Sequence, residues 1–544
     1  MTEPSNGLIE GHGGYLALAA LRGHGVDEIF TLSGGHIFPL YDAAHRTGVR
    51  LVDVRHEQTA VFAAEAVAKL QRRPGVAALT AGPGVTNGVS ALTSAHFNGS
   101  PVMVLGGRAP QWRWGAGSLQ ELDHVPIVAS ITKHAATVTS TGAIPAEVRH
   151  AAQVALTAHR GPVFLDFPMD VIFSRAEAQI GAPTLPQAVA PDPEQLAEAA
   201  GLIGRAKRPV IIAGSDVHIG DAVVALQECA RELQIPVYAN GMGRGCLPLG
   251  DPLAFSRSRR EALKAADVVI VAGTPLDFRL GFGDFGEAAV VHLVDAPSQQ
   301  APHVTAAASV AGDLSITLRG IAAQSGAPAS RAEWISRLRR AEDRAREADR
   351  ELLEADTDPI KPTRVYGELR RALDPDAVII CDGGDFVSYA GKYLEPGSPG
   401  CWLDPGPYGC LGVGPGYAIG ARLTYPDRQV CLLLGDGAAG FSLMDAESLV
   451  RQGLPVVIVV GNNGIWGLEK HPMKAVYGYD VAADLQPGLR YDDVVRALGG
   501  AGETVQKPEE LGPALKRAFS AGVPYLVNVL TDPTDAYPRS ANLA

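Results

Sequence analysis

The sequence has few cysteines and no long apolar run. Six cysteines occur in 544 residues, and no two of them form a CxxC pair. This pattern argues against a disulfide framework or a zinc site and is typical of reduced, buried thiols in a cytoplasmic protein. No apolar segment approaches the roughly 20 residues that a membrane-spanning helix needs. The first residues, MTEPSNGLIEGHGG, lack the basic start and apolar stretch of a signal peptide.

Basic residues are fewer than acidic ones, 47 against 59. The formal net charge is -12, so nucleic acid is not expected as a main partner, because binding to phosphate backbones needs a basic surface. Anionic small molecules are still compatible with this charge, because they bind through local groups. With 46% apolar and 19% charged residues, the composition is that of a soluble globular protein. At roughly 150 residues per domain, the length predicts about three domains.

Two irregular stretches divide the chain. IGAPTLPQAVAPDPE (180–194) is rich in proline, and AAQSGAPAS (322–330) is a second break, followed by a strongly charged surface helix. The predicted domains are 1–180, 190–325 and 355–544. Each alternates short Val/Ile/Leu runs with helical patterns, which predicts an α/β protein of three doubly wound parallel-sheet domains. In such sheets ligands bind at the carboxyl ends of the strands.

The third domain places a carboxylate and an amide after two neighbouring predicted strands. RQVCLLLGDG ends in a turn around Asp436, and LPVVIVVGNNG ends in a turn around Asn463. The intervening residues 438–461 suffice for one helix and one strand, so a crossover would set Asp436 beside Asn463. Each turn alone is a common loop sequence. Together, hard oxygen ligands and glycines that let the backbone approach closely predict a Mg²⁺ and diphosphate site.

These motifs resemble those of the thiamine-diphosphate-dependent enzymes. GDG followed about two dozen residues later by NN resembles the signature of that superfamily. VRHEQTAVFAAEAVAKL resembles its N-terminal glutamate segment, LTAGPGVTNGVSAL its pyrimidine-contacting loop, and YGCLGVGPGYAIGA the stretch that bends the cofactor. The superfamily includes acetolactate synthase, oxalyl-CoA decarboxylase, 2-hydroxyacyl-CoA lyase and pyruvate decarboxylase. The resemblance implies thiamine diphosphate and Mg²⁺ as cofactors and a homodimer or homotetramer.

The resemblance assigns roles to individual residues. Glu57 matches the glutamate that hydrogen-bonds the aminopyrimidine ring and promotes removal of the thiazolium C2 proton; a lone glutamate there would otherwise be a favourable helix start. Leu411 matches an apolar wedge that forces the two rings together, although it could simply be core, and the Gly409 carbonyl would accept from the amino group. Ile465 would complete the metal shell of Asp436 and Asn463 through its carbonyl. The expected cofactor-binding residues are Pro83, Asn87, Gly384, Asp385, Gly409, Leu411, Gly435, Gly437 and Ala438.

Three residues are candidates on the substrate side. His36, in TLSGGHIFPL, is placed to donate to a substrate hydroxyl or carbonyl, or is an ordinary hydrogen-bonded loop histidine. Gln120 resembles an active-site glutamine of acetolactate synthases. Glu469, six residues after Asn463, resembles a proton-handling residue of pyruvate decarboxylase; the alternative is an exposed helix carboxylate that pairs with a lysine.

The middle domain is expected to hold a nucleotide. Gly214, Arg279 and Asp295 follow three predicted strands, where arginine can bind a phosphate and aspartate can bind ribose hydroxyls. Relatives keep ADP or FAD in this domain. The alternative is a domain that bears only the fold.

The expected reaction is reversible cleavage of a 2-hydroxyacyl-CoA to formyl-CoA and an aldehyde or ketone. GDGAAGFSLMDAES resembles the acyl-CoA branch, and the tail residues Tyr537, Arg539 and Ser540 would close over the thioester ligand, unless the tail is a frayed terminus. The alternative is acetolactate synthase-like decarboxylation and ligation of 2-keto acids, which QELDHVPIVASITKH resembles, although the Gln-His pair of that enzyme is absent from CDGGDF. A nucleotide-binding regulator on a silent enzyme fold is a third reading, which intact Glu57, Asp436 and Asn463 disfavour.

Overall fold

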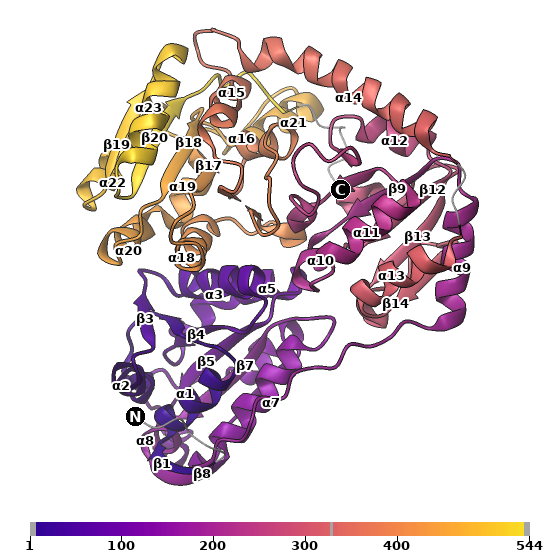
Figure 1. Cartoon of the computed structure of the whole chain (residues 1–544). Coiled ribbons are helices and arrows are strands. Elements are labelled where there is room, and N and C mark those ends of the chain that lie inside the picture. Colours follow the sequence, from indigo (N-terminus) through magenta and orange to yellow (C-terminus); the bar gives the residue numbers. More distant parts are fainter. Residues whose placement is uncertain (1–6, 327–329, 538–544) are drawn as a thin grey trace. The chain divides into compact units, whose positions relative to one another are not determined.

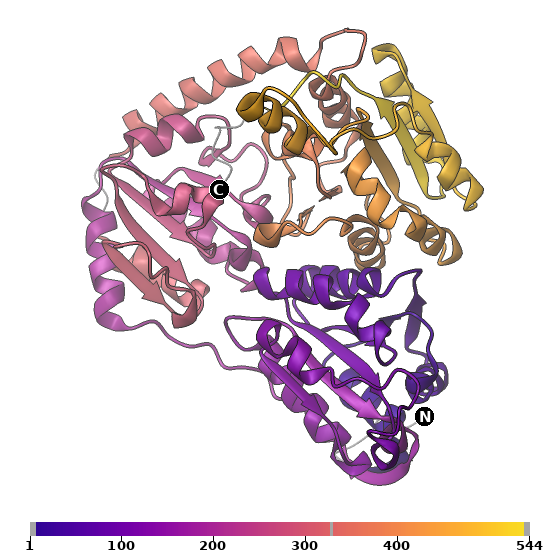
Figure 2. The same cartoon turned by 180° about the vertical axis from the view of Figure 1, so that it is seen from behind.

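The computed structural model describes residues 7–326 and 330–537. The described chain contains three six-stranded sheets, each with parallel pairing throughout, and an antiparallel ribbon of β1 (Leu8–His12) and β8 (Arg175–Gln179). Figure 1 labels the elements and Figure 2 shows them from behind. The predicted α/β fold with three parallel sheets is confirmed. Within the described ranges, no helix is both long and apolar enough to cross a membrane.

The chain forms two compact units that exchange segments along the sequence. The amino-terminal unit consists of 1–187, 408–426 and 442–454. The carboxyl-terminal unit consists of 188–407, 427–441 and 455–544. Segment 442–454, which comes shortly after the GDG turn, therefore packs with the first domain rather than with the sheet that precedes it.

The amino-terminal unit is built on one sheet with the strand order β3-β2-β4-β5-β7-β6. The strands β2, β4, β5 and β7 are buried along most of their length, whereas β3 and β6, which flank them at the two edges of the sheet, are mostly half-buried. The strands are β2 (Glu28–Thr31), β3 (Arg50–Asp53), β4 (Gly75–Leu79), β5 (Val102–Arg108), β6 (His134–Thr137) and β7 (Val163–Pro168).

Helices cover both faces of this sheet. One face packs against the apolar sides of α1 (Gly13–Gly23), α2 (Phe38–Thr47) and α7 (Ile144–Leu156). The other face carries α3 (Glu57–Gln71), nearly all of whose residues are buried because α18 (Gly414–Thr424) packs along it. The close approach of α18 to α3 depends on Gly416 and Gly420. A Cβ on Gly416 would lie 2.6 Å from the Phe62 Cβ, and a Cβ on Gly420 would lie 2.6 Å from the Ala63 carbonyl oxygen.

The carboxyl-terminal unit contains the other two sheets. The middle sheet has the order β11-β10-β9-β12-β13-β14, and the last sheet has the order β16-β15-β17-β18-β20-β19. The middle strands are β9 (Pro209–Ala213), β10 (Val237–Ala239), β11 (Ala254–Phe255), β12 (Val268–Ala272), β13 (Ala289–Val294) and β14 (Ala308–Ala311). The last sheet comprises β15 (Val378–Cys381), β16 (Trp402–Leu403), β17 (Val430–Gly435), β18 (Val457–Asn462), β19 (Ala501–Val505) and β20 (Tyr525–Leu530).

Amphipathic helices bury the faces of these sheets. The middle sheet has α9 (Pro193–Arg205), α11 (Val223–Leu233) and α13 (Leu314–Gln324) on one face, with α12 (Arg259–Ala265) on the other. The last sheet packs against α15 (Pro362–Ala372) and α23 (Pro508–Ser520). The charged helix predicted after the second break is α14 (Ala332–Leu353), which contacts both α12 and α15 (Figures 1 and 2).

Candidate functional site

Asp436 and Asn463 follow adjacent strands of the last sheet. β17 and β18 pair in parallel through their last residues, so both turns lie at the same sheet edge, as the crossover spacing predicted. The Asp436 carboxylate accepts the N–H groups of Gly437 at 2.9 Å and Gly464 at 2.6 Å. These bonds fix the carboxylate against the second turn.

The Asp436 carboxyl has the properties of a ligand for a hard cation. It is 4% exposed, burial raises its pKa to about 6, and no described lysine or arginine pairs with it. The Asn463 side-chain oxygen accepts the Ile465 N–H at 3.2 Å, so the amide and the Ile465 carbonyl belong to one turn. A buried carboxylate without a cationic partner, beside amide and carbonyl oxygens, fits the all-oxygen coordination of Mg²⁺.

Three glycines of this edge stand where another residue would be crowded or strained. A Cβ on Gly437 would lie 2.5 Å from the Trp466 ring, and Gly384 has φ +116°, a conformation that favours glycine. A Cβ on Gly435 would lie 3.3 Å from the Gly383 carbonyl. The expected diphosphate residues Gly384, Gly435 and Gly437 are therefore positions where the packing or the backbone conformation favours glycine, and Ala438 beside them is buried.

The start of the predicted tail contacts the same sheet edge. Asp385 is buried, and its carboxylate accepts the Tyr537 N–H at 3.3 and 3.2 Å. The Tyr389 hydroxyl donates to Asp535 at 3.2 Å, and the Tyr389 and Tyr537 rings pack edge to face with centroids 4.9 Å apart. The tail is therefore held as far as Tyr537, whereas Arg539 and Ser540 lie outside the described residues.

Glu57 is the first residue of α3, as predicted. Its side chain is buried, and its Oε2 accepts the Asn87 Nδ2–H at 3.0 Å. Asn87 ends α4 (Pro83–Asn87), the helical turn that contains the expected Pro83. The Cβ position of Gly84 is 3.8 Å from Glu57 Oε1, so the loop and the carboxyl lie in contact. The structure thus joins the two segments that the sequence assigned to pyrimidine binding.

A buried polar chain, which the sequence reading missed, supports this loop. His124 Nε2 accepts the Gly82 N–H at 2.9 Å, and its Nδ1 lies 3.0 Å from the Asp166 carboxylate. Arg108 also donates to Asp166 at 3.0 Å, and both His124 and Asp166 are fully buried. Because Nε2 accepts, Nδ1 carries the proton and donates to Asp166. The signal in the sequence was an aspartate inside the apolar strand VFLDFP, which needs a buried partner.

His36 and Gln120 lie against the same loop. His36 Nδ1 is 3.2 Å from the Thr80 hydroxyl, and burial lowers the pKa of this histidine, which keeps the ring neutral at pH 7. Gln120 has φ +58°, and its Cβ is 2.9 Å from the position of a Cβ on Gly82. Two of the three predicted substrate-side residues are therefore grouped beside the loop that contacts Glu57.

The remaining predicted residues have mixed surroundings. Gly409 is exposed with φ +68°, and Leu411 is only half-buried, so Leu411 is not part of the core. Glu469, in the first turn of α21 (Gly467–Tyr477), is exposed and pairs with none of the described lysines or arginines. The adjacent Lys470 pairs instead with Asp480 at 3.0 Å. Glu469 is thus a free carboxylate rather than half of the ion pair considered from the sequence.

The middle-domain residues follow the strands as predicted. Gly214 comes directly after β9, and a Cβ there would lie 2.3 Å from the Gly273 carbonyl, so the backbones are in close contact. Asp295 follows β13 and is buried. Arg279 differs from the expectation of a free phosphate ligand, because its guanidinium forms an ion pair with Asp277 at 2.7 Å. A nucleotide would have to compete with that carboxylate.

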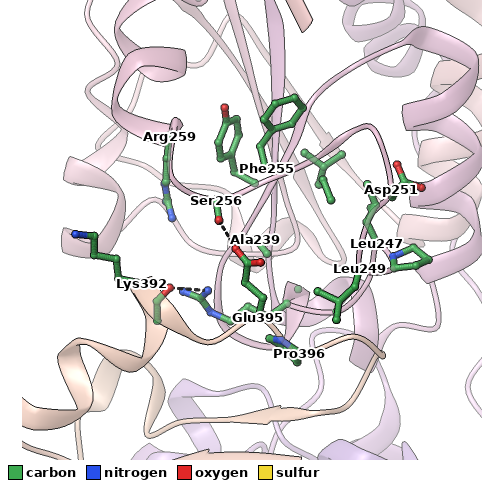
Figure 3. Close-up of a pocket in the computed structure, with 18 of the residues that line it drawn as sticks. Ala239, Leu247, Leu249, Asp251, Phe255, Ser256, Arg259, Lys392, Glu395 and Pro396 are labelled. Carbon is green, nitrogen blue, oxygen red and sulfur yellow. Dashed lines mark hydrogen bonds between the residues drawn. The ribbon is translucent and has the colours of Figure 1, made fainter. Parts of the chain in front are cut away.

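A cavity of about 770 Å³ lies within the carboxyl-terminal unit, beside the middle sheet (Figure 3). Its cationic lining residues are Arg244, Arg259, Arg339, Arg346 and Lys392, and its acidic ones are Asp251 and Glu395. Figure 3 shows Arg259 projecting toward the cavity and Glu395 accepting a hydrogen bond from Ser256, at 2.6 Å. No described carboxylate pairs with Arg259, and burial, with Arg244 and Arg279 nearby, lowers the pKa of Arg259 to about 10. This cavity is suited to an anionic ligand.

Comparisons with known proteins agree with the two cofactor-binding edges. The family described as thiamine pyrophosphate enzyme matches with its N-terminal TPP binding domain at 12–127, its central domain at 196–321 and its C-terminal TPP binding domain at 382–529. A Mycobacterium bovis protein named "Probable acetolactate synthase" is 53% identical over 539 residues, which cover 98% of each chain.

More distant relatives carry another name. "2-hydroxyacyl-CoA lyase 2" of Caenorhabditis elegans is 36% identical over 577 residues, and the human protein of that name is 33% identical over 584 residues. Each alignment covers 96% of this chain and 90% of the relative. With all three domains matched and relatives aligned along nearly the whole sequence, the chain belongs to the thiamine pyrophosphate enzyme family.

Proposed function

We propose that this protein is a thiamine-diphosphate- and Mg²⁺-dependent enzyme that decarboxylates one 2-keto acid and joins the product to a second, as an acetolactate synthase does. The observation that carries this proposal is the 53% identity, over 98% of both chains, with a protein named for that activity. It favours the alternative reading of the sequence over the cleavage of 2-hydroxyacyl-CoA, because the relatives named for the latter share only 33–36% of aligned residues in the two comparisons given above.

The residues of this chain have distinct tasks in either reaction. When bound, thiamine diphosphate supplies a nucleophilic carbon and an electron sink beside the substrate carbonyl. Glu57 holds and returns a proton at the pyrimidine ring, and Asn87 orients its carboxyl through the 3.0 Å hydrogen bond. Asp436, Asn463 and the Ile465 carbonyl would hold the Mg²⁺, which would supply positive charge for the diphosphate. In the amino-terminal unit, Pro83 would face the pyrimidine ring, and in the carboxyl-terminal unit the backbone of Gly384, Gly435, Gly437 and Ala438 would face the diphosphate.

The substrate side depends on neutral donors. His36, kept neutral by burial, hydrogen-bonds the Leu119 backbone and would exchange that bond for one to the substrate carbonyl oxygen, and Gln120 would contact the second substrate. Leu411, half-buried beside Gly409, has a side chain free to contact the rings of the cofactor. Neither His36 nor Gln120 carries a charge. They can therefore hydrogen-bond a substrate carbonyl without forming an ion pair that would slow release of the acidic product.

Substrate panels test the proposal directly. The purified protein with thiamine diphosphate and Mg²⁺ is expected to release CO₂ from pyruvate and form acetolactate faster than it cleaves any 2-hydroxyacyl-CoA. Steady-state kinetics on a series of 2-keto acids and 2-hydroxyacyl-CoAs measure both rates. Formyl-CoA release that outpaces pyruvate consumption would contradict the proposed reaction and leave the cofactor assignment intact.

The second candidate is cleavage of 2-hydroxyacyl-CoA, and the cationic cavity favours it. A CoA ester carries several phosphate charges, whereas a small 2-keto acid carries a single carboxylate. Arg259 has no described anionic partner, and Arg244 donates to the Gly391 carbonyl at 3.0 Å while its Nε has no hydrogen-bond partner among the described residues. Half-buried guanidinium groups without a carboxylate partner offer a bound anion charge-assisted hydrogen bonds.

Arg259→Gln separates the two candidates. If acyl-CoA binds in the cavity, this change should raise KM for the acyl-CoA about tenfold, which is the worth of one hydrogen bond to a charged group. Turnover of pyruvate should be unaffected. Arg260→Gln is the matched control, because Arg260 is adjacent on α12, is exposed and does not line the cavity. Equal KM values for acyl-CoA in wild type and Arg259→Gln would remove the support that the cavity gives to this candidate.

A further inference from the structure

Asp445, a buried carboxylate outside the predicted site, accepts hydrogen bonds from residues on both sides of Glu57. Asp445 follows α19 (Asp436–Ser442) and lies within segment 442–454 of the amino-terminal unit. Its Oδ1 accepts the Arg55 backbone N–H at 2.7 Å, and its Oδ2 accepts the Thr59 hydroxyl at 2.6 Å. Arg55 is two residues before Glu57 and Thr59 is two residues after it. One carboxylate therefore spans the turn from which α3 begins.

The cost of this arrangement indicates a role beyond packing. Asp445 is 1% exposed, and no described lysine or arginine pairs with it. Burial raises the pKa of Asp445, while its hydrogen bonds with Thr59, Arg55 and Ser448 oppose that shift. The third donor, the Ser448 hydroxyl, lies 2.8 Å from Oδ1. An unpaired buried carboxylate is expensive, and a packed apolar residue would fill the same space at lower cost.

Further polar contacts fasten the same segment to the strand before Glu57. Arg451 forms an ion pair with Asp53, the last residue of β3, and Gln452 donates to the Asp53 carboxylate at 3.2 Å. Arg50, the first residue of β3, donates to the Gln452 carbonyl at 3.2 Å. These contacts are exposed or half-buried, so water weakens them, whereas the Asp445 contacts are shielded from water. Asp445 therefore makes the buried hydrogen bonds between segment 442–454 and the start of α3.

We infer that Asp445 is a positioning residue that fixes the Glu57 carboxyl for proton transfer at the cofactor. This inference rests on the proposed role of Glu57, which is common to both candidate reactions. Among the described side chains, Asn87 alone donates a hydrogen bond to the Glu57 carboxyl, so the placement of this carboxyl depends on the backbone of the turn. A misplacement of about 1 Å at a reacting group can lower a rate about 100-fold.

The chemistry of the three donors explains why a carboxylate is needed. A backbone N–H cannot rotate away, and the Arg55 N–H points at Oδ1. In Asp445→Asn the amide NH₂ must replace one oxygen, so it faces either that N–H or the Thr59 hydroxyl. With the NH₂ in the place of Oδ2, the Thr59 hydroxyl must turn from donor to acceptor, and the bonds to Arg55 and Thr59 lose the strength that the negative charge gives them, although size and shape are preserved. The turn should then loosen without loss of the core.

The experiment compares variants that break the hydrogen bonds of Asp445 to Arg55 and Thr59, called the clasp, with variants that break the bonds of another buried carboxylate of α3. Asp445→Asn and Thr59→Val break the clasp, and Thr59→Ser keeps the hydroxyl and should restore the wild-type values. Glu65, also on α3, is a fully buried carboxylate that accepts the Ser100 hydroxyl at 3.0 Å and pairs with Lys69 at 2.9 Å. Glu65→Gln and Ser100→Ala therefore remove equivalent bonds away from the Glu57 turn.

Two readouts separate positioning from general destabilisation. In the cofactor-free protein, amide hydrogen exchange of residues 54–59 should accelerate in Asp445→Asn and Thr59→Val but not in Glu65→Gln or Ser100→Ala. With thiamine diphosphate and Mg²⁺ but no substrate, exchange of the C2 proton of the cofactor should slow by about 10- to 100-fold in the first pair. The dissociation constant of thiamine diphosphate, measured by calorimetry, should stay unchanged in all variants.

The outcomes are distinct. Wild-type C2 exchange in Asp445→Asn, or an equal loss in Glu65→Gln, overturns the positioning role. Glu57→Gln serves as the reference: if it also leaves C2 exchange at the wild-type rate, the proposed role of Glu57 fails. Non-additive losses in the Asp445→Asn/Thr59→Val double variant support a shared clasp, and strictly additive losses contradict it.

Discussion

Glu57→Gln should lose at least about 100-fold in turnover while it keeps its affinity for thiamine diphosphate. The amide preserves the size of the side chain, and its oxygen can still accept the Asn87 Nδ2–H that Glu57 accepts at 3.0 Å. What it loses is the ability to hold and return a proton in a buried position. Steady-state kinetics on the best substrate, with calorimetry for cofactor binding, measure the two effects separately.

Glu65→Gln is the control for this loss. Glu65 is another fully buried glutamate of α3, but its carboxylate pairs with Lys69 and accepts from Asn98 at 2.8 Å. It should destabilise the fold without changing turnover per folded molecule. A Glu57→Gln protein with near-wild-type activity would remove Glu57 from the proton transfer in either candidate reaction.

Asp436→Asn should weaken Mg²⁺-dependent binding of thiamine diphosphate by at least about 100-fold, since even the loss of partners that only orient metal ligands costs 10- to 100-fold. Asp436 provides the single anionic oxygen donor proposed for this site, and Asn463 and Ile465 offer only neutral ones. Calorimetry with and without EDTA measures the metal-dependent part of the affinity. Unchanged affinity for the cofactor would place the metal elsewhere.

In the absence of cofactor, Asp436→Asn should be favourable and stabilise the folded protein at high pH. Burial raises the pKa of Asp436 to about 6 from an ordinary value of 3.8, so between these values the folded protein binds more protons than the unfolded chain. The charged form therefore lowers stability above about pH 6, and this penalty disappears below about pH 4. Asp436→Asn should raise the melting temperature of the apoprotein at pH 8 and give no gain at pH 4. A lower melting temperature at pH 8 would mean that the carboxylate stabilises the apo fold.

Local patterns in the sequence were sufficient for the fold and for the cofactor edges. Strands that are apolar on both faces and alternate with helices specify covered parallel sheets, and each of the three sheets is parallel. The spacing between the two turns was enough to set Asp436 beside Asn463, because a crossover returns the chain to the neighbouring strand. Glu57 was identified in another way, through the resemblance of its segment to the glutamate segment of the thiamine-diphosphate enzymes, and the structure places it at the start of the helix that follows β3.

The partners of these residues could not be predicted in this way. The strand aspartate Asp166 meets His124 and Arg108, and Asp445 meets Thr59 across 386 positions of sequence. The pairing of Arg279 with Asp277 also changed the reading of the middle domain.

The sequence by itself determined the cofactor class and the three parallel sheets, because both depend on short-range periodicity and on motifs at strand ends. Only the tertiary structure decided which buried charges are paired and which are free: Asp445 is held by three dipoles, and Arg259 has no described counter-ion. The reason is physical. A buried charge takes its partner from whichever element packs against it. Segment 442–454 packs with the amino-terminal unit, although it is far along the chain from β3, the strand that it contacts there.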